Sequence, residues 1–167
     1  MFSRISVCPD SDCGERLWHA GLSPDGRYCF LADCNEDFIV WDVQQARVVW
    51  REDESSPEDA LHPELADWVD QDGYITIAEG PASGKYQIFG LQINHARCDD
   101  KTADLALRVE KKQKAVVVVQ RSSGRVLQVL EYEWFSGDWA FASFSYDGSV
   151  LAVIEPYFAT FFREGPE

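Results

Sequence analysis

Residues 18–51, WHAGLSPDGRYCFLADCNEDFIVWDVQQARVVWR, decide the fold. Short apolar runs alternate here with polar turns, and Ser23-Pro24-Asp25-Gly26 has the composition of a β-turn with proline at its first central position. This pattern predicts four strands joined by tight turns, which form a complete antiparallel meander. The expected strands are Leu17–Ser23, Arg27–Ala32, Phe38–Trp41 and Ala46–Trp50.

The same stretch carries two features at a characteristic separation, the Ser-Pro-Asp-Gly turn and the pair Trp41-Asp42. In this it resembles one blade of a WD-repeat β-propeller. Weaker echoes of the blade lie at residues 139–155 and 72–78. The resemblance implies a structural hydrogen-bond set, for which His19 and Trp41 match. Asn35 stands where the family has an aspartate, and the second strand lacks the usual serine or threonine.

The length of the chain bears on ring closure. At about 40–45 residues per blade, 167 residues give fewer than four blades. The chain is therefore an irregular four-bladed propeller, a partial propeller completed by a partner or a second copy, or a curved meander. An unpartnered strand at Phe2–Val7 is expected to pair with Tyr157–Arg163 and complete the last blade.

Outside residues 18–51, the pattern of apolar residues predicts further strands, except in segment 52–72. Expected strands are Lys85–Asn94, Ala103–Val109, Val116–Val119, Arg125–Tyr132, Trp139–Ser145 and Ser149–Glu155, with Val116–Val119 buried on both faces. Segment 52–72 instead holds 9 acidic residues in 21 with no lysine or arginine. Helix starts at Ser56 and Glu64 make it an acidic, partly helical insertion. The fold class is thus all-β, mostly antiparallel meanders, in one small or incomplete β-propeller-like domain over residues 1–167.

Charge and composition indicate which classes of partner and which cellular compartment the sequence favours. The formal net charge is −14, which disfavours nucleic-acid binding and favours attraction to a basic protein, although acidity for solubility alone is an alternative. No apolar run approaches the ~20 residues that span a bilayer, and the first residues lack the apolar core of a signal peptide. Five cysteines, an odd number, suit free thiols. These features predict a cytoplasmic protein with no membrane partner.

The sequence offers no catalytic constellation and implies no cofactor or metal. The loop Gly80–Tyr86 has one residue too few between its glycines for a phosphate loop, and a tyrosine stands where serine or threonine belongs. His95 and Cys98 are neighbours, but no third group that would orient a base accompanies them. We therefore expect a protein that is not an enzyme.

Two functional hypotheses follow. The first is an acidic inhibitor that binds and occludes a cationic protein, as immunity proteins (antitoxins) do with bacterial nuclease toxins. The residues expected to contact the partner are Glu52, Asp53, Glu54, Glu58, Asp59, Trp68, Asp70 and Asp72. Trp68 has two interpretations, an aromatic anchor ringed by carboxylates or a pin that holds the insertion to the body. The second hypothesis is a scaffold subunit that docks into a larger complex or self-associates through strand edges.

Overall fold

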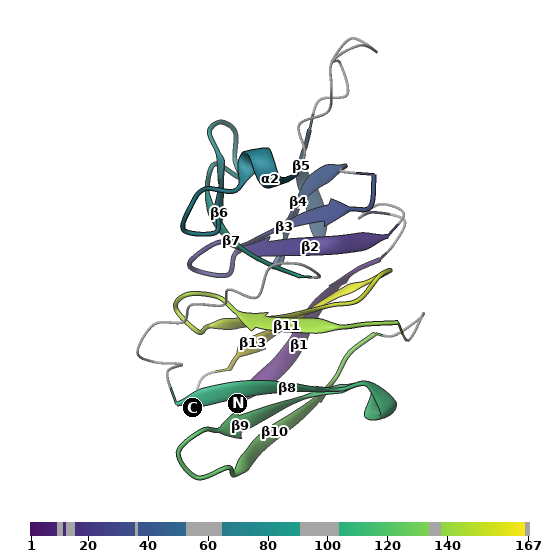
Figure 1. Cartoon of the computed structure of the whole chain (residues 1–167), viewed down its shortest axis with the longest axis vertical. Helices are drawn as coiled ribbons and strands as arrows, with labels where there is room; N and C mark the ends of the chain where they lie inside the picture. The colour runs from purple at the N-terminus through teal and green to yellow at the C-terminus, as the bar shows by residue number, and fades with distance from the viewer. Residues whose placement is uncertain are drawn as a thin grey trace.

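Three antiparallel sheets stack on one another in the computed structural model, which describes residues 1–9, 12, 16–35, 37–52, 65–90, 104–133 and 138–165 (Figure 1). The six-stranded sheet has the order β5 (Arg47–Arg51), β4 (Phe38–Asp42), β3 (Tyr28–Asp33), β2 (Leu17–Leu22), β7 (Gly84–Gly90), β6 (Tyr74–Ile77). The four-stranded sheet has the order β1 (Phe2–Cys8), β13 (Ala159–Glu164), β12 (Val150–Ile154), β11 (Phe141–Phe144). The three-stranded sheet has the order β10 (Val126–Glu131), β9 (Ala115–Gln120), β8 (Leu105–Glu110). The all-β fold predicted from the sequence is confirmed, in a form consistent with a small propeller-like domain.

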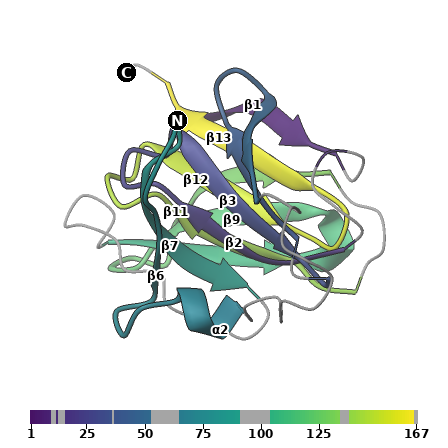
Figure 2. The same cartoon turned by 90° about the horizontal axis from the view of Figure 1, so that it is seen from above.

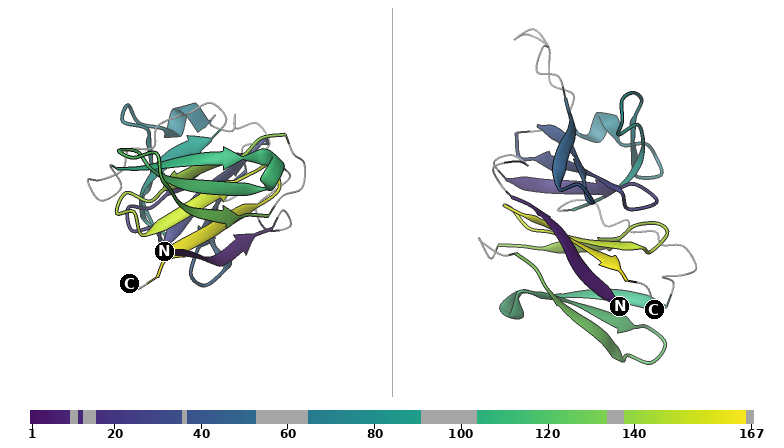
Figure 3. Two further views of the ribbon diagram at one scale, coloured as in Figure 1. Left: turned by 90° about the horizontal axis from the view of Figure 1, so that it is seen from below. Right: turned by 180° about the vertical axis from the view of Figure 1, so that it is seen from behind.

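The four-stranded sheet is the middle layer, because it is apolar on both faces. On β12, Val150, Ala152 and Ile154 face the six-stranded sheet, while Leu151 and Val153 face the three-stranded sheet. Side chains alternate across a strand, so a continuous apolar run has to be covered on both sides. Seen from above, the six-stranded sheet covers the stack, and seen from below the three-stranded sheet is outermost (Figures 2 and 3).

The N-terminal strand completes the middle sheet. β1 pairs antiparallel with β13 from Phe2 opposite Glu164 to Cys8 opposite Ala159, which confirms the pairing expected from the sequence. The hydroxyl of Ser6 donates to the carbonyl of Val43 at 2.7 Å, and this bond ties β1 to the six-stranded sheet. At its other end, the side-chain amide of Gln128 accepts from the N–H of Phe2 and donates to its carbonyl. β1 thus joins all three layers.

The meander predicted over residues 18–51 is present as β2 to β5, paired in sequence order. The sheet does not end there, because β7 pairs with the free edge of β2 and β6 pairs with β7. This extension of the sheet was not expected from the sequence. With three sheets among the described strands, the propeller-like stack is open rather than closed.

A third core covers the outer face of the six-stranded sheet. It gathers Phe30, Phe38 and Val40 with residues of the β6–β7 hairpin and the short helix α2 (Leu65–Trp68), which matches the helix restart expected at Glu64. The opposite end of the stack has no such cover among the described residues, and Val126, Leu127 and Val129 of β10 are exposed there. β9 is central in its sheet, as expected, and a 3₁₀ turn at Lys111–Gln113 leads into it.

The hydrogen-bond set implied by the WD-repeat resemblance is incomplete. Within the described part of the chain, neither Nε2 of His19 nor Nε1 of Trp41 has a hydrogen-bond partner, although both side chains are buried. β3, which carries the bridging serine or threonine in the family, is Tyr-Cys-Phe-Leu-Ala-Asp here. The meander β2 to β5 is therefore held by strand pairing and apolar packing, not by this polar set.

Burial lowers the pKa of His19 below 6.5, and the sign of the resulting pH dependence follows. The unfolded chain takes up a proton near pH 6.5 that the folded protein takes up only at lower pH, so stability falls as the pH drops below 6.5. We expect His19→Gln to lose less free energy of unfolding than the wild type between about pH 7.5 and about pH 5.5. Urea unfolding at both pH values measures this, and parallel losses in the two proteins would contradict it.

Among the cysteines that the structure describes, Cys8 and Cys29 are buried, Cys34 is half-buried, and none of the three forms a disulfide. No helix in the described ranges is both long and apolar enough to span a bilayer.

Candidate functional site: a pocket where three turns meet

The first turn, Ser23-Pro24-Asp25-Gly26, links β2 to β3 and is closed by its own side chains. Ser23 Oγ donates to Asp25 Oδ1 at 2.7 Å and accepts from the N–H of Tyr28 at 3.0 Å. The N–H of Gly26 donates to the carbonyl of Ser23, and Gly26 has a φ of +64°, a conformation that glycine adopts without strain. Serine, aspartate and glycine therefore all have a structural task here.

The second turn, Ser145-Tyr146-Asp147-Gly148, links β11 to β12 and repeats the same hydrogen bonds. Ser145 Oγ donates to Asp147 Oδ1 at 2.7 Å and accepts from the N–H of Val150 at 3.0 Å. The two turns also contact each other, because the N–H of Asp147 donates to the carbonyl of Pro24 at 3.0 Å. The sequence echo at residues 139–155 thus corresponds to a structural repeat, and Pro24 and Tyr146 occupy equivalent positions.

The third turn, Asp70-Gln71-Asp72-Gly73, precedes β6, and an aspartate takes the place of the serine. Asp70 Oδ1 accepts from the N–H groups of Tyr74 at 3.0 Å and Asp72 at 2.9 Å. The N–H of Tyr74, then that of Asp72 and the ammonium of Lys85, lower the pKa of the Asp70 carboxyl below its usual value. The echo expected at residues 72–78 therefore begins with this turn.

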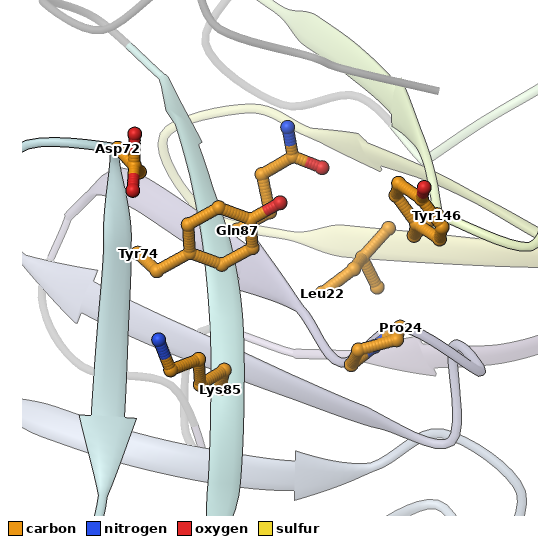
Figure 4. A pocket seen from close by; sticks show the side chains of 7 residues that line it. All are labelled: Leu22, Pro24, Asp72, Tyr74, Lys85, Gln87 and Tyr146. Atoms are coloured by element: carbon orange, nitrogen blue, oxygen red, sulfur yellow. The ribbon is translucent and has the colours of Figure 1, made fainter. Parts of the chain in front are cut away.

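One residue from each turn lines a pocket of about 330 Å³ (Figure 4). Pro24, Tyr146 and Asp72 form its walls. Its floor is the row Leu22, Gln87 and Tyr74, which lie opposite one another on the neighbouring strands β2, β7 and β6, with Lys85 beside them. Pockets near this volume, with an apolar lining and a few polar groups, are typical of sites that take one side chain or a small ligand.

The pocket has a topological cause. β2 lies against β12 and β7 lies against β11, the edge strand of the middle sheet, whereas β6 extends one strand beyond that edge and has no comparable neighbour in the middle sheet. The face of β6 that carries Tyr74 therefore overhangs the stack. Tyr146, 48% exposed, stands at the opposite side of this overhang, so the pocket opens to solvent between two tyrosines.

Charges in the pocket fall into one pair and one single group. Lys85 Nζ lies 3.9 Å from Asp70 Oδ2 and 5.9 Å from the ring centroid of Tyr74, so a cation already sits near that ring. The carboxylate of Asp72 has no hydrogen bond or ion pair with any other residue that the structure describes. Counted together with Asp70, which pairs with Lys85 from outside the lining, the pocket and its border carry one excess negative charge, next to two aromatic rings.

The structure distributes the eight partner-binding residues expected from the sequence unevenly. Asp72 lines the pocket, and Asp70 lies beside it, 3.9 Å from the ammonium of the lining residue Lys85. Glu52 follows β5, which is at the opposite edge of the six-stranded sheet from β6. Trp68 is half-buried and packs edge-on against Phe38 with ring centroids 5.4 Å apart, the arrangement of a pin. Asp53, Glu54, Glu58 and Asp59 lie outside the described residues.

Sequence reasoning missed the residues that complete the pocket, namely Leu22, Pro24, Tyr74, Lys85, Gln87 and Tyr146. The repeated Ser-x-Asp-Gly pattern was a signal, since it placed Pro24 and Tyr146 at the same turn position. That the turns converge on one point depends on how the sheets stack, which the pattern does not contain.

A second pocket, of about 370 Å³, lies on the β3–β5 side and is lined by Arg27, Arg47 and Asp42 among others. Asp42 is buried and accepts from the N–H groups of Gln44 and Gln45, which closes the β4–β5 turn. Its carboxylate also lies 4.0 Å from Arg27. The carboxylate in this pocket is therefore already bonded within the β4–β5 turn, so it is less suited to bind a ligand.

The lining of the first pocket, where the three turns meet, suits noncovalent recognition, because it supplies aromatic faces, a carboxylate, an amide and an ammonium. No group of three or more metal-ligating side chains occurs among the residues described. No protein-family model matches the chain, and no curated protein is detectably similar to it.

Proposed function

We propose that this protein is a non-enzymatic binding module that occludes a cationic protein, as an immunity protein does with a nuclease toxin. The observation that carries the proposal is that Asp72, at the end of the acidic segment 52–72, lines an open pocket with Tyr74 and Tyr146. Tyrosine anchors in a pocket beside charged groups are typical of the centres of protein interfaces.

Long-range electrostatics support the same proposal. A net charge of −14 on 167 residues attracts a basic protein before contact and raises the rate of encounter, more strongly at low salt. Carboxylates of the segment 52–72 would then cover basic residues that the partner uses for its own phosphate-bearing substrate. Occlusion of this kind requires no chemistry from the inhibitor.

The test is capture of partners from native lysate at low salt, followed by elution in a salt gradient. We expect one basic protein to elute at moderate salt, and Glu58→Lys/Asp59→Lys to weaken its binding about tenfold or more. A matched control of equal charge, Glu79→Lys/Glu131→Lys, alters exposed acids outside segment 52–72 and should weaken binding less. Equal elution of the wild type and the first variant would contradict the proposal.

The second candidate function is a scaffold subunit, and one observation favours it. Val126, Leu127 and Val129 of the edge strand β10 expose 48%, 39% and 54% of their surface at the uncovered end of the stack. An apolar edge strand is a site at which a second copy or a larger complex can add a strand. A stable dimer in light scattering would favour this candidate over the inhibitor, and a monomer would favour the inhibitor.

A further inference from the structure

The charges of the pocket where the three turns meet, called the turn pocket here, indicate what kind of ligand it can bind. Lys85 is the cation among the lining residues, and Asp70 lies within 3.9 Å of its ammonium. The carboxylate of Asp72 has no partner within the described part of the chain, so one negative charge faces an open pocket. An unpaired carboxylate at such a place favours a cationic ligand.

The apolar part of the pocket restricts the kind of cation. Leu22 and Pro24 present hydrocarbon surface, while Tyr74 presents a ring from the floor and Tyr146 presents a ring from a wall. The face of Tyr74 already has the Lys85 ammonium near it, so the open ring is that of Tyr146. A ligand that satisfies all of these groups has an apolar stem and a charged, flat end that can lie on an aromatic ring.

Arginine matches this description better than lysine. Its guanidinium is planar and stacks on aromatic rings, and its fork of N–H groups can donate two parallel hydrogen bonds to one carboxylate. A lysine ammonium is a compact, strongly hydrated charge, and loses more hydration when it enters a partly apolar pocket. The polar side chain of Gln87 on the floor adds an amide oxygen that can accept a further N–H.

We infer that the turn pocket binds one arginine side chain of the partner, with the guanidinium held between the carboxylate of Asp72 and the ring of Tyr146, which line opposite sides of the pocket. The inference rests on the proposed function only in taking a basic protein as the source of the arginine. It assigns a role to Tyr146 and Asp72 that differs from the long-range attraction by the segment 52–72.

The experiment uses N-acetyl-arginine methylamide as the probe and follows the protein by NMR during titration. We expect saturable shifts of the ring signals of Tyr74 and Tyr146 and of the amide of Asp72, with millimolar affinity. Asp72→Asn should weaken binding at least about fivefold, because it removes the charge and keeps the shape. Glu131→Gln, an exposed acid on β10, is the matched control and should bind the probe as the wild type does.

Two further probes decide the chemistry. The uncharged isostere N-acetyl-citrulline methylamide is expected to shift the same signals at least about fivefold less tightly, and N-acetyl-lysine methylamide more weakly than arginine. Citrulline binding equal to arginine binding, or shifts spread over the whole acidic surface, would overturn the inference. Tyr146→Ala that keeps full partner binding, while Glu58→Lys/Asp59→Lys loses it, would overturn the inference and leave the proposed function standing.

Discussion

Gly26→Ala is expected to lower the free energy of unfolding by about 2–5 kcal/mol. Two effects add at this position. Gly26 has a φ of +64°, which costs a residue with a Cβ about 1–2 kcal/mol. A methyl group there would also lie 2.5 Å from Cβ of Val150 and 3.1 Å from Cβ of Ser145, so that the two stacked turns would have to separate, at about 1–3 kcal/mol.

Gly124→Ala is the matched control, because it contains the first effect without the second. Gly124 has a φ of +68°, close to that of Gly26, and no atom lies within 4 Å of the position of an added Cβ. We expect a loss of only about 1–2 kcal/mol, from backbone strain. Equilibrium urea unfolding of both variants gives the difference. Equal losses would contradict the close packing of the first turn on the second, and with it the geometry of the pocket.

Phe161→Ala is expected to destabilise the protein by about 3–5 kcal/mol, the range for truncating a buried aromatic side chain. Phe161 lies on β13 in the core between the middle and the six-stranded sheets and has no exposed surface. β13 is central in the middle sheet, with β1 on one side and β12 on the other, so the surrounding side chains cannot collapse freely into the cavity. Such a loss is a large part of the stability of an ordinary domain.

Val129→Ala is the comparison variant, because it truncates an exposed side chain instead of a fully buried one. Val129 also lies on a strand, β10, but it is 54% exposed, and we expect a change within about 0.5 kcal/mol. Thermal or urea unfolding of the two variants therefore tests the order of the layers. A large loss for Val129→Ala would mean that this face is covered in solution, and would favour self-association through the uncovered end of the stack.

Most strands could be predicted because their signals are local. The meander over residues 18–51 is set by apolar runs separated by turn residues, and each turn residue acts through bonds within the turn. The apolar run Ala115–Val119 similarly indicated a central strand, and β9 is central in its sheet. Pairing of β1 with β13 was also predictable, because β1 lacked a neighbour along the chain and would otherwise have left the outer edge of β13 unpaired, which is unfavourable.

The candidate site was predicted only in part. Asp70, Asp72 and Trp68 were selected for their acidic surroundings; of these, Asp72 lines the pocket and Asp70 contacts its lining residue Lys85. The choice could not separate a binding role for Trp68 from a packing role, because both are compatible with a large aromatic residue in an acidic segment. Only the contact of Trp68 with Phe38 in the structure indicates the packing role.

The sequence by itself determined the elements whose causes lie within a few residues, which are the strands, the turns, the excess of acid and the absence of a recognisable catalytic motif. The tertiary structure decided that β7 pairs with β2, that β6 overhangs the middle sheet and that three distant turns meet. The physical reason is that the hydrogen-bonding edge of a strand and the apolar face of a sheet do not by themselves specify which partner they pair with. Any strand of suitable length can pair with the edge of β2, and the choice among them is made by the packing of the whole chain.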